Sequence, residues 1–134
     1  YVAERLSESA FQKLLDSDEV FVACAQSDNA LVGFIVVKYR SSCPIKADLE
    51  NSAELQRLYV IPECHGTNSS KLLLSEALKE CLEKGIDTIW LSVYSGNSRA
   101  KKFYSKFGFQ EIGTTHFKMG NEQHLDIIMV AHIA

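Results

Sequence analysis

The 134-residue sequence lacks several features that would place it in a specialised class of protein. No apolar run approaches the roughly 18 residues that cross a membrane, so we expect no membrane span. Basic residues are not in excess: 14 Lys and Arg stand against 17 Asp and Glu, and the net charge of −3 argues against a nucleic-acid binder. The first residues also lack the charged start and apolar core of a signal peptide.

Cysteine is sparse and is not arranged in closely spaced pairs. The four cysteines are Cys24, Cys43, Cys64 and Cys81. They show no CxxC spacing, and no Cys/His cluster has the spacing of metal ligands. Disulfide-stapled domains are usually smaller and richer in cysteine. We therefore expect four free thiols, a cytoplasmic protein and no bound metal.

What is present is the composition of an ordinary globular domain. Hydrophobic residues make up 46% of the chain and charged residues 23%, so the low hydrophobicity and high net charge of disordered chains are absent. The length suffices to bury a sizeable core but is short for two domains. No repeat, low-complexity segment or linker interrupts the sequence, and we expect one domain over residues 1–134.

Hydrophobic periodicity and turn residues divide the chain into helices and strands. Ser27-Asp28-Asn29 between two β-rich runs predicts a hairpin, and Gly85 and Gly108 are placed to end two helices. The predicted elements are a helix over 3–15, strands over 20–26 and 31–39, a loop over 40–53, a strand over 54–61, a helix over 69–84, a strand over 88–94, a helix from the Asn97 cap to 107, and strands over 109–118 and 125–133.

The order of these elements predicts a mixed α/β sheet. The strand–helix–strand unit over residues 54–94 implies a parallel pair of strands with a right-handed crossover. The flanking hairpins imply antiparallel strands on both sides. A single crossover among antiparallel strands excludes a flavodoxin-like nucleotide binder.

Two segments carry patterns that suit ligand binding. In Leu58–Leu73, a strand ends at Pro62, a polar loop of small residues follows and a helix begins. The unpaired N–H groups at that helix N-terminus suit an anion such as pyrophosphate; an ordinary strand–loop–helix connection is the alternative. The second segment, Asn97–Phe109, predicts a short helix with its aromatic residues on one face, where Tyr104 is either a core residue or a catalyst.

Together the two segments resemble the GNAT superfamily of acetyl-CoA-dependent N-acetyltransferases. The family pattern N-x-x-A-x-x-F-Y-x-x-x-G-F is complete from Asn97 to Phe109. The resemblance covers residues 20–134. It implies the GNAT fold, a mixed, mostly antiparallel sheet with a central splayed parallel strand pair and flanking helices. It also implies an enzyme with acetyl-CoA as its co-substrate.

A more specific resemblance is to the branch that includes bacterial spermidine/spermine acetyltransferases. It rests on Glu54–Val60, Phe117–Gly120 and Asp126–Met129. The acceptor it implies is a polyamine, another small amine or a peptide amine. Carboxylates that converge on the acceptor side would favour cationic amines, polyamines first, whereas scattered surface charge is the alternative. These carboxylates are Asp48, Glu50, Glu54, Glu63, Glu122 and Asp126.

The resemblance also assigns coenzyme contacts along the cleft between the splayed strands. Backbone groups of Leu58, Tyr59 and Val60 are expected to pair with the pantetheine arm. Asn97, with Ala100 beside it, is expected to contact the coenzyme; Asn97 also suits the N-cap of its helix. The expected pyrophosphate loop and helix start comprise His65, Gly66, Thr67, Asn68, Ser69, Ser70 and Lys71.

This loop departs from the family form (R/Q)-x-x-G-x-(G/A). His65 replaces a longer polar side chain, Asn68 replaces the first glycine, and Ser70 replaces another small residue. Asparagine is the non-glycine residue that best tolerates a left-handed backbone, so we expect Asn68 to keep the turn in that conformation. The departures favour one alternative function, a GNAT-fold binding or scaffold module that no longer catalyses.

Acyl transfer to an amine needs a base for the ammonium and an acid for the leaving thiolate. The resemblance implies direct attack in a ternary complex, with Tyr104 giving its proton to the sulfur. The family often has a glutamate on the first splayed strand, so Glu54 is the expected base; the alternative is that Glu54 is a solvated residue at the strand edge. Asp126, His116 and His124 are the alternatives.

The N-terminal part is short against the family pattern. A GNAT domain usually opens with a strand and two helices, whereas one helix is predicted here before the first hairpin. Either a segment precedes this sequence or the first strand has been lost. In the family, that part usually forms one wall of the acceptor site, so the chemical identity of the acceptor is the feature that the sequence determines least. The sequence is compatible with a homodimer.

Overall fold

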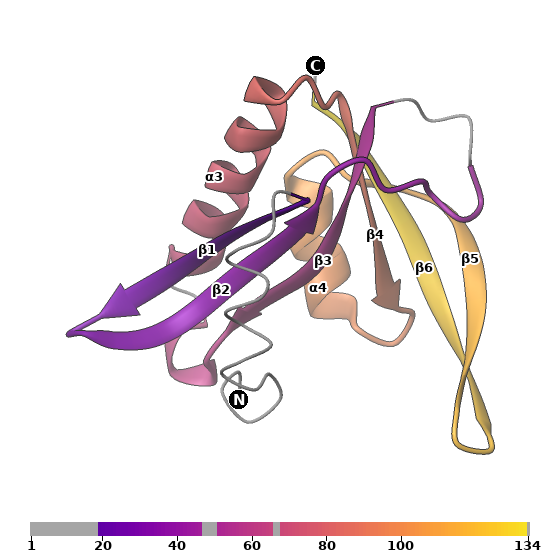
Figure 1. The fold of residues 1–134 in the computed structure, drawn as a ribbon. Helices are drawn as coiled ribbons and strands as arrows, with labels where there is room; N and C mark the ends of the chain where they lie inside the picture. Colours follow the sequence, from indigo (N-terminus) through magenta and orange to yellow (C-terminus); the bar gives the residue numbers. More distant parts are fainter. Residues whose placement is uncertain (1–18, 47–50, 66–67, 134) are drawn as a thin grey trace.

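The computed structural model describes residues 19–46, 51–65 and 68–133 (Figure 1). The helix predicted over 3–15 lies outside the described residues. The elements in chain order are β1 (Val20–Ser27), β2 (Ala30–Lys38), β3 (Ser52–Val60), the 3-10 turn η1 (Pro62–Cys64), α3 (Ser69–Glu83), β4 (Thr88–Tyr94), α4 (Ser98–Lys106), β5 (Gln110–Met119) and β6 (Glu122–His132). Each α-helix and strand agrees with a predicted element except at its ends, whereas η1 lies where a polar loop is expected.

Two strands begin at least two residues earlier than the sequence predicts. β3 starts at Ser52, inside the predicted loop over 40–53, because Ser52 pairs with Thr88 of β4. β6 starts at Glu122 because its ladder with β5 continues to the Met119–Glu122 pair beside the turn.

The strands form one six-stranded sheet in the order β1-β2-β3-β4-β6-β5 (Figure 1). The β3–β4 pair is parallel, and the other neighbouring pairs are antiparallel. Helix α3 connects the two parallel strands, as the strand–helix–strand pattern predicts. The mixed, mostly antiparallel sheet expected from the sequence is confirmed.

The parallel pair is short because β3 bends away from β4. The two strands pair only through Ser52–Thr88, Ala53–Ile89 and Glu54–Trp90. In the β2–β3 ladder the register skips Gln56, which makes Gln56 the extra residue of a β-bulge. Bulges bend a strand and increase its twist. Beyond the bulge the two strands diverge (Figure 1).

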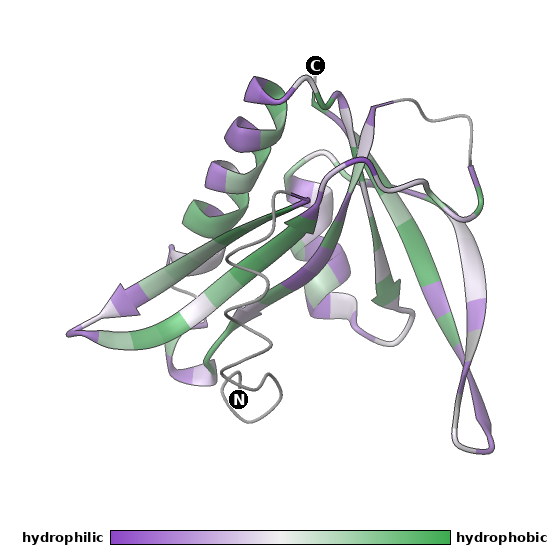
Figure 2. Ribbon diagram, viewed as in Figure 1, coloured by the Kyte–Doolittle hydropathy of each residue, from purple (hydrophilic) through white to green (hydrophobic). Residues whose placement is uncertain are grey.

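Both described helices cover one face of the sheet, and the main core lies between the helices and that face. Figure 2 shows α3 with its hydrophobic side toward the sheet and its hydrophilic side outward. The buried helix residues of this core are Leu73, Leu74, Ala77 and Cys81 of α3 and Tyr104 of α4. Alternate strand residues, such as Ile89, Leu91 and Val93 of β4, complete it.

A smaller cluster closes the opposite face over the paired end of β3 and β4. It consists of Cys43, Trp90, Ile128 and Val130. The Trp90 indole Nε1–H donates to the carbonyl oxygen of Ser41 at 2.9 Å, so the loop after β2 is fastened there. This face continues past Trp90 to Ser92 and Tyr94, because alternate residues of a strand share a face.

Gly33 of β2 allows β2 and β3 to approach closely. A Cβ at this position would lie 2.6 Å from the carbonyl oxygen of Tyr59 and 2.9 Å from Cγ2 of Val60. We expect Gly33→Ala to lower the free energy of unfolding by about 1–3 kcal/mol, because β3 must shift to admit the methyl group. Denaturant unfolding measures the change. Unfolding at the wild-type midpoint would contradict the close contact.

The described part of the chain offers no group of three or more His, Cys, Asp or Glu side chains that could hold a metal ion. All four cysteines are free thiols. Burial raises the pKa of Cys81 to about 11, so its thiol stays protonated at neutral pH. None of the described helices is long and apolar enough to cross a membrane.

Candidate active site

A cleft of about 510 Å³ opens where β3 and β4 separate. Its volume is in the range of small-molecule sites. The lining residues are Phe34 of β2; Leu55, Gln56, Arg57, Leu58 and Tyr59 of β3; Leu91, Ser92, Val93 and Tyr94 of β4; and Asn97, Ala100 and Tyr104 at α4. The sequence prediction of a cleft between these two strands is therefore confirmed in its geometry.

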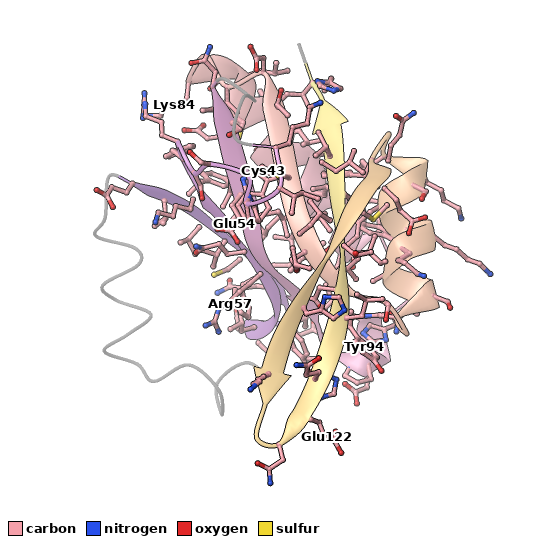
Figure 3. All side chains as sticks on the ribbon, turned by 90° about the vertical axis from the view of Figure 1, so that its right-hand side faces the viewer. Cys43, Glu54, Arg57, Lys84, Tyr94 and Glu122 are labelled. Carbon is pink, nitrogen blue, oxygen red and sulfur yellow. The ribbon has the colours of Figure 1, made fainter. Side chains whose placement is uncertain are left out.

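The cleft has an apolar side and a polar side. On the helix side, Leu55, Leu91, Val93 and Tyr104 belong to the main core. On the opposite side, the lining is aromatic and polar, with Arg57 and Tyr94 exposed. In Figure 3, Arg57 lies along β3 beyond Glu54, and Tyr94 lies at the far end of β4. An alkyl-amide arm suits the first side and a polar acceptor the second.

Tyr104 is both a core residue and a cleft residue. Its side chain is 9% exposed, and its ring contacts Phe103 and Phe109 edge-on, with centroids 5.4 and 5.5 Å away. Burial raises the pKa of Tyr104 to about 12. The phenol therefore keeps its proton at neutral pH, which is the state a general acid requires.

The end of α4 fixes the position of Tyr104. The Gly108 N–H donates to Ser105 at 3.1 Å and the Phe109 N–H donates to Tyr104 at 3.1 Å, the bond pattern of a Schellman motif. Gly108 has a φ of +91°, which only glycine adopts without strain. The Gly-Phe that ends the sequence pattern thus brings the Phe109 ring onto Tyr104.

Asn97 caps α4, as its helical context predicts. Its Oδ1 accepts the Ala100 N–H at 3.1 Å, and its own N–H donates to the Tyr94 carbonyl at 2.9 Å. Asn97 and Ala100 also line the cleft. Since the cap uses the side-chain oxygen, the amide nitrogen can donate to a ligand.

The far part of β3 offers backbone groups to the cleft. Leu58 and Tyr59 line it, whereas Val60 does not. Beyond Glu54 the β4 side of β3 has no paired strand among the described residues. A bare strand edge presents N–H and C=O groups that can pair with an extended ligand. The two amides of a pantetheine arm match this edge.

The predicted pyrophosphate loop is described on both sides of Gly66 and Thr67, which lie outside the described residues. Nε2 of His65 lies 2.8 Å from the Val60 carbonyl oxygen, and because a carbonyl can only accept, the ring donates there. His65 therefore fastens the loop to the end of β3.

The expectation of a left-handed backbone at Asn68 is wrong. Asn68 has φ −79° and ψ 1°, and it is the N-cap residue of α3. Its carbonyl oxygen accepts the Leu72 N–H at 2.9 Å, so Asn68 already takes part in the first helical turn. The N-cap position needs no positive φ. Asn68 therefore does not replace a glycine in a left-handed conformation.

The start of α3 nevertheless suits an anion. Its first turn contains no acidic residue, and the Asn68 side chain makes no capping hydrogen bond to it. Ser69 and Ser70 are small and Lys71 is an exposed cation. N–H groups and the helix dipole favour negative charge at such a terminus. The described residues thus fit coenzyme A at its arm and at its phosphates.

Glu54 lies at the closed end of the cleft and is not a lining residue. Its Oε1 accepts from Ser41 Oγ at 3.4 Å and from Gln56 Nε2 at 3.3 Å. Gln56 lines the cleft, so the expected base stands one side chain behind its wall. A proton would reach Glu54 from the cleft through water.

The three alternative bases lie on the C-terminal hairpin. Asp126 accepts from Ser92 Oγ, a cleft residue, at 2.5 Å. The His124 ring contacts Tyr94 edge-on at 5.8 Å. His116 is exposed on β5. Asp126 and His124 thus both contact residues of the cleft wall, and Asp126 does so through a hydrogen bond.

The four described carboxylates of the acceptor hypothesis, Glu54, Glu63, Glu122 and Asp126, do not line the cleft. Asp48 and Glu50 lie outside the described residues. Among the four described carboxylates only Glu54 and Asp126 bond to a lining residue. Arg57, a cation, does line it.

Several lining residues were missed by the sequence reasoning. Gln56 and Arg57 are consecutive polar residues in a strand, which breaks the apolar–polar alternation and marks the bulge. Ser92 is the polar residue near the end of an otherwise apolar strand. Both signals were present in the sequence. Phe34 gave no such signal, because an apolar residue in an apolar strand is expected in the core.

Comparison with known proteins identifies the family. The family model described as acetyltransferase (GNAT) family matches residues 2–109. The chain belongs to the GNAT acetyltransferase family. The family and the fold expected from the sequence are thereby confirmed.

Three GNAT relatives illustrate the similarity. An uncharacterised N-acetyltransferase of Mycobacterium tuberculosis is 30% identical over 99% of this chain and 80% of its own length. A spermidine N(1)-acetyltransferase of Thermoplasma acidophilum is 36% identical over 82% of this chain and 62% of its own length. The crystal structure of PaiA N-acetyltransferase from Thermoplasma acidophilum, in complex with coenzyme A, superposes with a TM-score of 0.76 at 30% identity, covering 98% of this chain and 74% of that one.

Proposed function

We propose that this chain transfers the acetyl group of acetyl-CoA to a primary amine. The observation that carries the proposal is one cleft that unites a bare strand edge, the Asn97 cap and a protonated Tyr104. When bound, acetyl-CoA supplies the acetyl group as an activated thioester. The four free thiols support a reducing, cytoplasmic location.

The described chain offers partners for two parts of the coenzyme, its arm and its phosphates. The backbone of Leu58 and Tyr59 would pair with the amides of the arm. Ala100 would leave room beside the arm, and the Asn97 amide nitrogen would donate to it. The start of α3, with Lys71, would hold the phosphates.

Two side chains handle the protons. A primary ammonium with a pKa near 10 must lose a proton before it attacks, and Glu54, which is hydrogen-bonded to the cleft residue Gln56, accepts that proton through solvent. Tyr104 donates its phenolic proton to the departing sulfur and so prevents the release of a high-energy thiolate. The amine attacks directly while both substrates are bound.

The acceptor that the observations favour is a cationic amine, with polyamines first. The similarity to a spermidine acetyltransferase supports this choice. Glu54 and Asp126 stand directly behind the cleft wall on the polar side. The positive charge of Arg57, which lines the cleft, offsets part of the attraction of these two carboxylates for a cation.

The Michaelis constant for spermidine is expected to rise as salt increases from low concentration to about 0.5 M. Exposed charges are screened over about 10 Å at 0.1 M salt, and less far at higher salt. A neutral amine, assayed in the same buffers, serves as the control and should show no such rise. Efficient use of neutral or acidic amines with polyamines untouched would contradict the choice of acceptor.

A screen of amines tests the proposed function itself. Acetyl-CoA is incubated with each amine, and free thiol is followed with a colorimetric reagent. The expected result is thiol release that depends on the amine, together with an acetylated product in the mass spectrum. Release at the rate of hydrolysis alone, with every class of amine, would contradict the proposal.

A further inference from the structure

Asp126 of β6 has one satisfied and one unsatisfied carboxylate oxygen. Its Oδ2 accepts from Ser92 Oγ at 2.5 Å. Its Oδ1 is buried and has no hydrogen-bond partner among the described residues. A buried polar atom without a partner costs free energy, and a charged one costs more. Such an atom calls for a donor that the described chain does not supply.

Asp126 stands at the polar side of the cleft. It is directly opposite Tyr94 in the β4–β6 ladder, and both Tyr94 and Ser92 line the cleft. Ile128, the next residue of β6 on the same face, belongs to the cluster that faces away from the helices. The carboxylate therefore lies across the sheet from Tyr104 and from the apolar side.

The surroundings of Asp126 suit a cation. The Tyr94 ring is 51% exposed, and an aromatic ring attracts an ammonium group. His124 contacts this ring at 5.8 Å and lies 3.5 Å from the Glu122 carboxylate. Thr115 of β5 faces Asp126 across the second ladder and is uncharged. The elements packed against Asp126 thus bring an aromatic ring beside its carboxylate, whereas the Glu122 carboxylate is 80% exposed and is engaged by His124.

We propose that Asp126 binds the amine of the acceptor. Asp126 lies directly behind the lining residues Ser92 and Tyr94, so the side chains around its buried Oδ1 must shift to admit the ammonium group. Oδ1 then accepts an N–H of that group, Ser92 holds the other oxygen in place, and Tyr94 flanks the cation. This inference rests on the proposed function and adds the residue that recognises the amine. The acceptor therefore carries a cationic nitrogen that reaches the polar side of the cleft.

Glu54 and Asp126 differ in the hydrogen bonds that their carboxylate oxygens already accept. Oε1 of Glu54 already accepts from Ser41 and Gln56, whereas Oδ1 of Asp126 accepts from nothing described. Glu54 also sits at the closed end of the strand pair. The two carboxylates accordingly have separate tasks: proton acceptance for Glu54 and amine binding for Asp126.

Asp126→Asn is the main test because it removes the charge and keeps the shape. The Michaelis constant for the best amine found in the screen is expected to rise roughly 10- to 100-fold, the range for losing a hydrogen bond to a charged group. The dissociation constant of acetyl-CoA, measured by titration calorimetry, should change by less than about two-fold. Asp126→Glu, which restores the charge, should recover part of the loss.

Glu122→Gln is the matched control on the same strand. The Glu122 side chain is 80% exposed, so its variant should keep the Michaelis constant within about two-fold. Ser92→Ala is a second test at an exposed residue, and it should raise the constant about two- to five-fold. If Asp126→Asn does not fold, the Michaelis constant of Ser92→Ala decides whether Asp126 binds the amine.

Wild-type Michaelis constants in both Asp126→Asn and Ser92→Ala, with folding confirmed by circular dichroism, would overturn the role of Asp126. That result would leave the acetyltransferase activity standing. A wild-type protein that releases no thiol with any amine would instead overturn the proposed function, and this inference with it.

Discussion

Tyr104→Phe is expected to lower kcat for amine acetylation by roughly 10- to 1000-fold, the usual effect of losing a general acid. The change removes only the hydroxyl group, and the ring keeps its contacts with Phe103 and Phe109. The affinity for acetyl-CoA should therefore stay within about two-fold. Because burial raises the pKa of Tyr104 to about 12, the wild-type acid stays protonated while amines become neutral near pH 10.

Steady-state thiol release measures this effect, and Tyr39→Phe is its control. Tyr39 is also buried and its pKa is also raised to about 12, but it lies outside the cleft. The same chemical change there should leave kcat unaltered. Equal kcat values for Tyr104→Phe and the wild type would remove Tyr104 from the mechanism and leave it a core residue.

Ala100→Trp is expected to weaken acetyl-CoA binding by roughly 100-fold, which corresponds to about 2.7 kcal/mol. Ala100 lines the cleft between Asn97 and Tyr104, so an indole ring would occupy the space for the coenzyme arm. The Asn97 cap bonds to the backbone N–H of residue 100, and that bond survives the change. Overfilling a packed site costs about 1–3 kcal/mol, which sets the scale of the effect.

Titration calorimetry on folded protein measures the loss, with Lys102→Trp as the control. Lys102 is exposed on the same helix and does not line the cleft. That variant should bind acetyl-CoA as the wild type does. Ala100→Leu, a smaller change, should give an intermediate affinity. Tight binding by a folded Ala100→Trp protein would place the coenzyme elsewhere.

The sequence predicts well the features that short-range patterns determine. Asn97 caps α4 through a bond to a residue three positions away. Gly108 ends the same helix with a positive φ. The strand–helix–strand order leads to the parallel pair because the connecting helix returns the chain to the end of the sheet where the first strand began. These features depend on neighbours in the chain, and neighbours are what a sequence displays.

Features that depend on distant residues were not predicted. The hydrogen bond between Ser92 and Asp126 joins two strands, and the two residues are 34 positions apart in the chain. The position of Glu54 behind the cleft wall depends on the bulge at Gln56, since the bulge sets where β3 leaves β4. The conformation of Asn68 was inferred from the glycine of the family pattern, whereas its position directly before the helix start at Ser69 makes it the N-cap residue.

Calorimetric titration of acetyl-CoA into the wild-type protein tests the central claim most directly. The cleft between β3 and β4, the bare edge of β3 and the start of α3 predict saturable binding with a dissociation constant in the micromolar range and one molecule per chain. Absence of binding at millimolar acetyl-CoA would contradict the account and would favour a GNAT-fold protein that does not use the coenzyme.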